Sequence, residues 1–252
     1  MAPEPRSVFI TGASSGLGHG LALWFARRGA RVFAAARRVE RLQALAGDPK
    51  RGRGSIEPVS VDVADSAAIR QALFRADDAV EGGLDLVIAN AGVGGNTNPR
   101  KGETWPLLER MLMVNVVGAA ATLDALARRM VERRRGHLVG ISSIAAWVVA
   151  PGSGTYTATK RFLEIYCAGL RLDLQGTGVA VTSIHPGFVK SEMTAPRKTP
   201  MPMLLETDDA VERMGRAILR RPKLFAFPWQ MALVARAAQW APESVRARAM
   251  RR

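Results

Sequence analysis

From Ser7 to Gly18 the chain reads SVFITGASSGLG, which is a short apolar run followed by a glycine-rich turn. An uncharged run that ends in a turn is typical of a buried strand, and a helical pattern begins near residue 16. Where a strand meets a helix, a tight glycine turn lets backbone N–H groups and the helix dipole receive a pyrophosphate. The sequence therefore predicts a dinucleotide-binding unit, whose turn contains Gly12, Ser14, Ser15, Gly16, Leu17 and Gly18.

Further short apolar runs alternate with longer helical patterns along the chain. We expect strands at 7–11, 31–35, 56–61, 84–89, 137–142 and 180–185, and a weaker seventh strand at 224–227. Helical patterns fall at about 16–28, 66–81, 105–133, 153–175 and 206–220. Strands that are separated by helices form parallel sheets whose right-handed crossovers place helices on both faces. The expected fold class is α/β, a doubly wound, Rossmann-like parallel sheet of six to seven strands, which binds ligands beyond the carboxyl ends of its strands.

The 252 residues show no linker near the middle, so we expect a single domain over residues 1–252. Residues 188–208 are too rich in proline for a regular helix and are expected to form a substrate lid, and residues 228–252 to form a C-terminal helical extension. No apolar run precedes the first strand, and no uncharged apolar stretch reaches about 18 residues, so a cytoplasmic protein is expected. Cys167 is the only cysteine and fits a buried, inert thiol, and the three histidines show no metal-ligand spacing, so no metal site is expected.

The net charge of +14 raises the question of a nucleic-acid partner. Thirty of the 36 basic residues are arginines, and they gather at the ends of predicted helices, where cations complement the helix dipole. No aromatic residues interleave these basic runs, although a surface that stacks single strands requires them. We therefore expect no nucleic-acid partner.

The end of the second expected strand reads Ala36-Arg37-Arg38. An acidic side chain at this place would bind both ribose hydroxyls of NAD and repel a 2′-phosphate, whereas a guanidinium group forms charge-assisted bonds to that phosphate. These residues therefore favour NADP(H). Arg37, 19 residues after Gly18, is the main candidate to bind the phosphate, with Arg38 next to it, although Arg37 also fits an ordinary helix surface. Asp62, which is followed by Val63, comes after the third expected strand and either contacts the adenine or caps the helix that begins near residue 66.

Tyr156 and Lys160 lie four residues apart in the helical pattern 153–175 and therefore share one face of a helix. A phenol has a pKa near 10, and a nearby cation favours its ionised form, so Lys160 would make Tyr156 a better proton donor and acceptor near neutral pH. Ser143 stands thirteen residues before Tyr156, at the end of the fifth expected strand. Each residue alone also fits a structural role, but together they indicate nucleotide-dependent redox catalysis.

The series of motifs from about residue 7 to residue 193 resembles the short-chain dehydrogenase/reductase family. The matching positions are Thr11 to Gly18, Asn90-Ala91-Gly92, Asn115, Ser143, Tyr156, Lys160 and Pro186-Gly187. The resemblance implies that Tyr156 is the general acid/base, that Lys160 lowers its pKa and holds the nicotinamide ribose, and that Ser143 binds the substrate oxygen. It implies that Asn115 positions a water in a proton relay and that Asn90 braces the sheet near the coenzyme. It also implies coenzyme contacts at Asn90, Ala91, Gly92, Pro186, Gly187, Val189 and Ser191. Ala89 and Ser191 depart from the residues that many members carry there.

We expect an NADP(H)-dependent carbonyl reductase or alcohol dehydrogenase that acts on an apolar ketone or aldehyde, because methionine and apolar residues fill the segment 188–205 and the positions after Ser143. The alternative is a redox-inactive dinucleotide-binding regulator of the same fold, which would need the glycine turn but no proton donor. The resemblance also suggests a homodimer or homotetramer that associates through the helices near 105–133 and 153–175. The C-terminal extension could cover the pocket, pack against a second subunit or rest on a membrane surface, and we favour packing.

Overall fold

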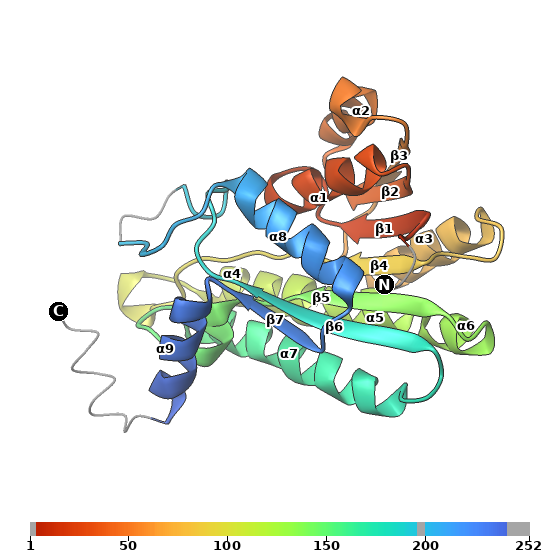
Figure 1. Cartoon of the computed structure of the whole chain (residues 1–252). Coiled ribbons are helices and arrows are strands. Elements are labelled where there is room, and N and C mark those ends of the chain that lie inside the picture. Colours follow the sequence, from red (N-terminus) through yellow and green to blue (C-terminus); the bar gives the residue numbers. More distant parts are fainter. Residues whose placement is uncertain (1–3, 196–199, 241–252) are drawn as a thin grey trace.

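Seven parallel strands form one sheet in the computed structural model of the chain, which describes residues 4–195 and 200–240 (Figure 1). The strands are β1 (Ser7–Thr11), β2 (Arg31–Ala36), β3 (Ser55–Ser60), β4 (Leu86–Ala89), β5 (Gly136–Ile141), β6 (Val179–Pro186) and β7 (Leu224–Phe227). Their order across the sheet is β3-β2-β1-β4-β5-β6-β7. The chain therefore builds outward from β1 to β3 and returns to the other side of β1, which opens a crevice between the carboxyl ends of β1 and β4.

Helices cover both faces of this sheet (Figure 1). The α-helices are α1 (Gly16–Arg27), α2 (Val39–Gly47), α3 (Ser66–Asp78), α4 (Trp105–Leu112), α5 (Ala119–Asp124), α6 (Ala127–Glu132), α7 (Gly154–Asp173), α8 (Thr207–Arg220) and α9 (Trp229–Gln239). Short 3₁₀ helices are η1 (Pro49–Arg51), η2 (Pro99–Lys101) and η4 (Ile144–Trp147), and η3 (Met113–Gly118) is a π-helix.

The alternation of side chains along β1 divides the core into two layers. Val8 and Ile10 pack with buried residues of α1, α2 and α8, whereas Phe9 packs with those of α3, α5 and α7. Successive side chains of a strand point to opposite faces, so an entirely apolar strand is stable only when both faces are covered. The doubly wound fold expected from the sequence is confirmed.

The structure also shows where the sequence patterns were incomplete. The weak run Leu224–Phe227 is the seventh strand, and it pairs in parallel with β6. Helix α2 was not expected, because only Leu42 and Leu45 of its residues are buried and the apolar signal is short. The single helix expected at 105–133 is a series of segments interrupted by the π-helix. Gly118 ends this π-helix where the backbone comes close to Val63, because a Cβ on Gly118 would lie 2.4 Å from the carbonyl oxygen of Val63.

The helical stretch from Trp105 to Glu132 is long and apolar enough to cross a membrane by length and composition. Its most apolar window has a mean hydropathy of 1.3, and 61% of that window is buried inside the fold. A packed core helix passes the same test, so the stretch is only weak evidence for a membrane span.

A cluster of charged side chains stabilises the side of the sheet where the strands have their amino ends. Asp77 on α3 is only 5% exposed; its Oδ1 accepts the backbone N–H of Leu84 at 2.8 Å and lies 2.9 Å from Nη1 of Arg133. Nη1 of Arg129 lies 3.1 Å from its Oδ2. A buried carboxylate that is fully paired ties α3, the start of β4 and the end of α6 together.

We expect Asp77→Ala to lower the free energy of unfolding by about 3 kcal/mol, because it leaves a backbone N–H and the half-buried Arg133 without their anion. Denaturant unfolding measures this change. Asp78→Ala is the matched control, since Asp78 pairs with the same Arg129 but is 65% exposed on its side chain, and it should cost no more than about 0.5 kcal/mol. Equal losses in the two variants would contradict the importance of the buried pair.

Candidate active site

The glycine turn after β1 lies at the carboxyl edge of the sheet. Gly12 and Gly16 have φ angles of 69° and 56°, a region that favours glycine. A Cβ on Gly12 would lie 2.8 Å from Cα of Ala91, and a Cβ on Gly18 would lie 2.4 Å from both Asn90 Nδ2 and the carbonyl oxygen of Gly12. The glycines are therefore required for the close approach between this turn and the segment after β4.

The amino end of α1 has the properties of an anion site. Its N-cap, Ser15, makes no side-chain capping bond, and no acidic residue occupies the first turn. The first N–H groups of a helix and its dipole attract an anion, and here no carboxylate of the first turn supplies one. The turn therefore fits a pyrophosphate, and Gly12, Ser14, Ser15, Gly16, Leu17 and Gly18 are placed to hold it.

Thr11 fixes the Asn90-Ala91-Gly92 segment beside the turn. Its Oγ1 accepts the backbone N–H groups of Asn90 and Ala91 at 3.0 and 3.1 Å. In the opposite direction, Nδ2 of Asn90 donates to the carbonyl oxygen of Thr11 at 2.9 Å. Sequence reasoning assigned the bracing to Asn90 and overlooked the hydroxyl of Thr11, although Thr11 stands within the glycine motif.

The π-helix η3 positions Asn115, which is buried. Oδ1 of Asn115 accepts the backbone N–H of Val93 at 2.8 Å, and Nδ2 donates to the carbonyl oxygen of Val93 at 2.9 Å and to Oγ1 of Thr159 at 3.1 Å. Asn115 therefore joins the segment after β4 to helix α7. Both side-chain amide hydrogens of Asn115 are used by these bonds, so a water that it positions would donate to one of its carbonyl oxygens.

Lys160 on α7 is buried at the end of β5. Its Nζ donates to the carbonyl oxygen of Ile141 at 2.9 Å, and the hydroxyl of Ser142 donates to the carbonyl oxygen of Lys160 at 2.7 Å. Nζ lies 5.9 Å from the centroid of the Tyr156 ring, and a Cβ on Gly92 would lie 3.2 Å from it. The structure therefore brings Lys160, Tyr156 and the segment after β4 together, as the sequence predicted.

Burial lowers the pKa of Lys160 to about 8. The ammonium form still predominates at pH 7, so a cation lies near the phenol under ordinary conditions. Because the unfolded chain keeps the usual pKa, the unfolded state binds more protons between pH 8 and 10.5, and the stability conferred by this residue rises with pH in that window.

Ser143 begins the loop that follows β5. Its Oγ accepts the backbone N–H of Ala145 at 3.0 Å and donates to the carbonyl oxygen of Pro186, the last residue of β6, at 3.4 Å. The side chain is half-buried. Ser143 is thus placed between the carboxyl ends of β5 and β6, with its hydroxyl oriented by the backbone of both.

His185 packs against this loop on the side of β6. Its Nδ1 lies 3.2 Å from the carbonyl oxygen of Ser143, and its ring stacks on Trp147 at 4.7 Å between centroids. Trp147 in turn donates from Nε1 to Glu164 at 2.8 Å, and the guanidinium of Arg236 on α9 lies over its ring at 4.5 Å. Burial lowers the pKa of His185 to about 4, so the ring is neutral at pH 7 and serves as a structural support.

Of the two arginines after β2, Arg38 contacts the glycine turn. It donates to Oγ of Ser14 at 3.1 and 3.0 Å and to Oγ of Ser15 at 2.9 Å. The side chain of Arg37 is 61% exposed and pairs with Asp62 at 3.8 Å. The sequence placed more weight on Arg37, because it could not show that the backbone directs the next arginine toward the turn.

Asp62 lies at the end of β3 but does not cap α3. The cap is Asp65, whose side chain accepts the N–H of Ala68, so the capping interpretation of Asp62 is wrong. Burial on its own would raise the pKa of Asp62, but the N–H of Ala64 and the nearby guanidinium groups of Arg110 and Arg37 outweigh it, and the pKa is lowered. The neighbouring Val63 is buried.

The segment after β6 crosses the site. Val189 forms a parallel bridge with Leu205, and Ser191 starts a turn that Thr194 closes by accepting its N–H at 2.9 Å. Within 188–195 and 200–206 there is no regular helix, as expected. A Cβ on Gly94 would lie 3.2 Å from Sδ of Met193 and 3.6 Å from Cδ2 of Tyr156. The sequence patterns did not indicate that Met193 and Tyr156 both lie beside Gly94.

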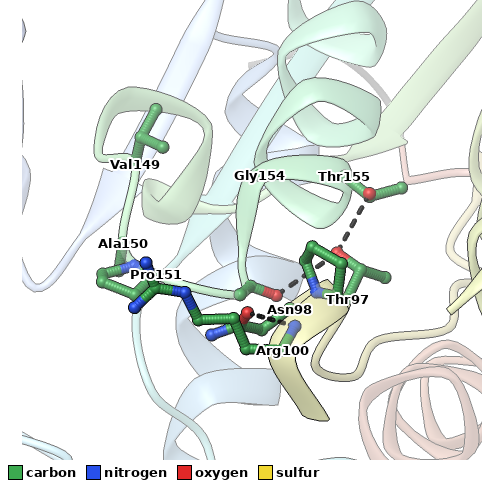
Figure 2. Close-up of a pocket in the computed structure, with 10 residues that line it drawn as sticks. Thr97, Asn98, Arg100, Val149, Ala150, Pro151, Gly154 and Thr155 are labelled. Atoms are coloured by element: carbon green, nitrogen blue, oxygen red, sulfur yellow. Dashed lines mark hydrogen bonds between the residues drawn. The ribbon is translucent and has the colours of Figure 1, made fainter. Parts of the chain in front are cut away.

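A cavity of about 510 Å³ adjoins the residue before Tyr156 (Figure 2). Its walls come from the loop after β4 with η2 and from the loop after η4; the lining residues are Thr97, Asn98, Pro99, Arg100, Val149, Ala150, Pro151, Gly152, Gly154 and Thr155. Thr97 joins the two walls, because its N–H donates to the carbonyl oxygen of Gly152 at 2.9 Å and its hydroxyl to Oγ1 of Thr155 at 3.0 Å. The lining is mixed in character, because it combines the apolar residues Val149, Ala150 and Pro151 with polar residues and Arg100.

Other expectations can be compared with the described residues. Cys167 is buried, and burial raises its pKa to about 12, which agrees with an inert thiol. Among the residues that the structure describes, no group of three or more His, Cys, Asp or Glu side chains could hold a metal ion. Residues 196–199 of the expected lid and residues 241–252 of the expected extension lie outside the described residues.

Comparison with known proteins agrees with the motif series. The family model described as short chain dehydrogenase matches residues 6–201. An uncharacterized oxidoreductase of Myxococcus xanthus (strain DK1622) is 52% identical over 247 residues, which cover 98% of this chain and 97% of that protein. Serine 3-dehydrogenase of Rhizobium radiobacter is 34% identical over 191 residues, 76% of this chain and 75% of that protein.

The solved structures agree as well. A short-chain dehydrogenase from Sphingobium yanoikuyae in complex with NADPH superimposes with a TM-score of 0.80 at 27% identity and covers 95% of this chain and 97% of that one. Fold and site together define an oxidoreductase of the Rossmann type. The chain belongs to the short-chain dehydrogenase family.

We expect the free energy of unfolding of the wild type to rise relative to that of Lys160→Met as the pH increases. The rise should be about 3 kcal/mol between pH 8 and 10.5. The reason is that the buried ammonium opposes folding until it loses its proton. Urea unfolding of both proteins across this range measures the difference. A difference that stays constant with pH would show that Lys160 is already hydrated in the folded protein.

Proposed function

We propose that the protein is an NADP(H)-dependent oxidoreductase that transfers a hydride between nicotinamide and a carbonyl compound or secondary alcohol. The observation that carries the proposal is the buried ammonium of Lys160, held 5.9 Å from the Tyr156 ring by the end of β5. A charge kept out of water is costly, and such groups concentrate at functional sites. Ser143 and the glycine turn at the same edge of the sheet supply the remaining elements of the chemistry.

The residues of the chain account for the proton side of the reaction. When bound, the nicotinamide supplies or accepts the hydride. In reduction, the hydroxyl of Tyr156 gives its proton to the carbonyl oxygen, so that the carbonyl group becomes an alcohol. Ser143 donates a hydrogen bond to the same oxygen and stabilises the negative charge that develops on it. Lys160 stabilises the phenolate that results. Oxidation follows the same path in reverse.

The preference for NADP(H) rests on charge at the end of β2. Arg38 lies on the glycine turn and Arg37 beside it, and the strand end carries no carboxylate. Guanidinium groups bind phosphate through paired, charge-assisted hydrogen bonds. The solved relative with NADPH supports the same choice. The pyrophosphate would be held by the turn, and the nicotinamide end by Asn90-Ala91-Gly92, Tyr156, Lys160, Pro186-Gly187, Val189 and Ser191.

We expect Tyr156→Phe to reduce kcat by about 10²–10⁴-fold, because the proton donor is lost while the ring remains. Absorbance of reduced nicotinamide over a panel of aldehydes and ketones measures turnover, and fluorescence of bound NADPH measures coenzyme affinity, which should change little. Thr159→Ser is a suitable control on the same helix. Absence of turnover in both wild type and Tyr156→Phe, with NADPH bound equally, would favour the redox-inactive regulator instead.

For the substrate we propose an apolar ketone or aldehyde. Met193 lies beside Gly94 and Tyr156, and Val149, Pro99 and Pro151 line the cavity. Methionine and aliphatic side chains accommodate bulky apolar groups. A second candidate is a hydroxy acid or oxo acid, which is favoured by Arg100 in the cavity wall and by the similarity to serine 3-dehydrogenase.

We expect the highest kcat/KM on apolar ketones and aldehydes and little change in Arg100→Gln. If acids are the substrates, the wild type should prefer them, and Arg100→Gln should raise KM for acids by about tenfold through the loss of a charge-assisted bond, with kcat nearly unchanged. Steady-state kinetics on matched pairs of ketones with and without a carboxylate distinguish the two. Lys101→Gln, next to it in η2, is the control for a change in surface charge.

Self-association through the long helices remains a proposal, and the exposed apolar residues support it. On α4 and η3 these are Trp105, Leu112, Met113 and Val117, and on α7 they are Phe162, Ile165 and Leu172. Large apolar side chains gathered on two neighbouring helices are typical of subunit interfaces. A homodimer or homotetramer would bury them.

The C-terminal extension is described as far as Trp240. Ala235 of α9 packs with Ile144, Ala146 and Trp147 of η4, while Trp229, Leu233 and Val234 remain exposed. This arrangement supports the use of α9 to cover the substrate side of the site. Subunit packing or contact with a membrane surface by the exposed side, and a cytoplasmic location, stay predictions.

A further inference from the structure

Glu192 bridges two parts of the chain that are far apart in the sequence. It lies in the segment after β6, and its Oε2 accepts a hydrogen bond from Nη1 of Arg38 at 2.9 Å. Its Oε1 pairs with Arg41, which lies on α2. One carboxylate therefore spans two guanidinium groups of the β2–α2 junction.

This pair of guanidinium groups lies where the nucleotide is expected. Arg38 is fixed on the glycine turn by its bonds to Ser14 and Ser15, and Ser15 is the N-cap of α1. The end of β2 next to the glycine turn is where dinucleotide-binding folds distinguish a free ribose hydroxyl from a phosphate. Glu192 thus places a carboxylate between Arg38 and Arg41, at the position where the adenine-side ribose of the nucleotide is expected to bind.

Glu192 remains charged at all ordinary pH values. Hydrogen bonds from Arg41 and Arg38 lower its pKa to about 2. Its side chain is 53% exposed, so the contact is open to exchange with solvent and with other anions. A carboxylate and a phosphate present similar oxygen pairs to a guanidinium group, and they therefore compete for it.

We propose that Glu192 is an internal counter-anion of a 2′-phosphate site, which holds Arg38 and Arg41 in the coenzyme-free protein and is displaced from them by the 2′-phosphate of the coenzyme. This inference rests on the proposed use of NADP(H). It makes Glu192 a specificity-determining residue, because its carboxylate weakens the binding of phosphate-bearing nucleotides by competition and leaves nucleotides without the 2′-phosphate unaffected.

Replacement of Glu192 by the 2′-phosphate would also affect the neighbours of Glu192 near Tyr156. Met193 follows Glu192 directly and lies beside Gly94, close to the Tyr156 ring. Ser191 and Thr194 form the turn that carries both residues. When the phosphate binds the two arginines, the segment loses its ion pairs with the β2–α2 junction, while the Val189–Leu205 bridge and the turn at Ser191 remain.

Calorimetric titration with 2′,5′-ADP and with 5′-AMP tests the proposal without any turnover. We expect Glu192→Gln to bind 2′,5′-ADP about three- to tenfold more tightly than the wild type, as the removal of two exposed ion pairs allows, and 5′-AMP with unchanged affinity. The gain should shrink at high salt, because the pairs are exposed. Glu206→Gln is the matched control: Glu206 also forms an exposed ion pair, with Lys190 of the same segment, and its loss changes the net charge equally.

The possible failures are distinguishable. If Glu192→Gln binds 2′,5′-ADP no better than Glu206→Gln does, or binds it more weakly, Glu192 is not a competing anion and the inference is overturned while the NADP(H) proposal stands. If the wild type binds 5′-AMP as tightly as 2′,5′-ADP, the NADP(H) proposal itself fails and the inference fails with it. Thermal unfolding confirms that each variant is folded before titration.

Discussion

The buried ammonium of Lys160 imposes the main constraint on this structure. A charge removed from water must be compensated, and the compensation comes from the carbonyl oxygen of Ile141 at the end of β5. The bond fixes the height of α7 along the sheet, and with it the position of Tyr156 one turn earlier. Ser142 secures the same helix from the strand side. The position of Tyr156 on the sheet thus follows from how Lys160 satisfies its charge.

The order of the strands provides the place for this arrangement. Because the chain returns from β3 to the far side of β1, β1 and β4 are neighbours, and the glycine turn lies directly against the Asn90-Ala91-Gly92 segment. Thr11 and Asn90 hold the two sides at a fixed separation through reciprocal hydrogen bonds. The Asp77 ion pairs, which stabilise the fold, lie at the other end of the strands from this candidate site.

Much of this organisation could be predicted from the sequence. Strands such as Ser7–Thr11 are buried on both faces and therefore apolar throughout, and the glycine turn has a spacing that reflects steric necessity, so the fold and the approximate site were accessible. Helix α2 was missed because it buries little surface. The π-helix was missed because the apolar pattern of 105–133 is continuous and does not show the change in hydrogen bonding at Met113–Gly118. The close approach of Gly118 to the backbone of Val63 was missed because it joins distant parts of the chain. Contacts between distant parts of the chain also explain why the sequence could not show that Arg38 donates hydrogen bonds to Ser14 or that it forms an ion pair with Glu192.

The packing of α9 bears on how such enzymes diverge. A Cβ on Gly187 would lie 3.0 Å from Sδ of Met231, and Arg236 covers Trp147, which in turn stacks on His185 behind Ser143. The final described helix therefore packs against the loop that carries Ser143. Because α9 contacts this loop from outside the sheet, a substitution in α9 can reach the surroundings of Ser143 without any change in the strands.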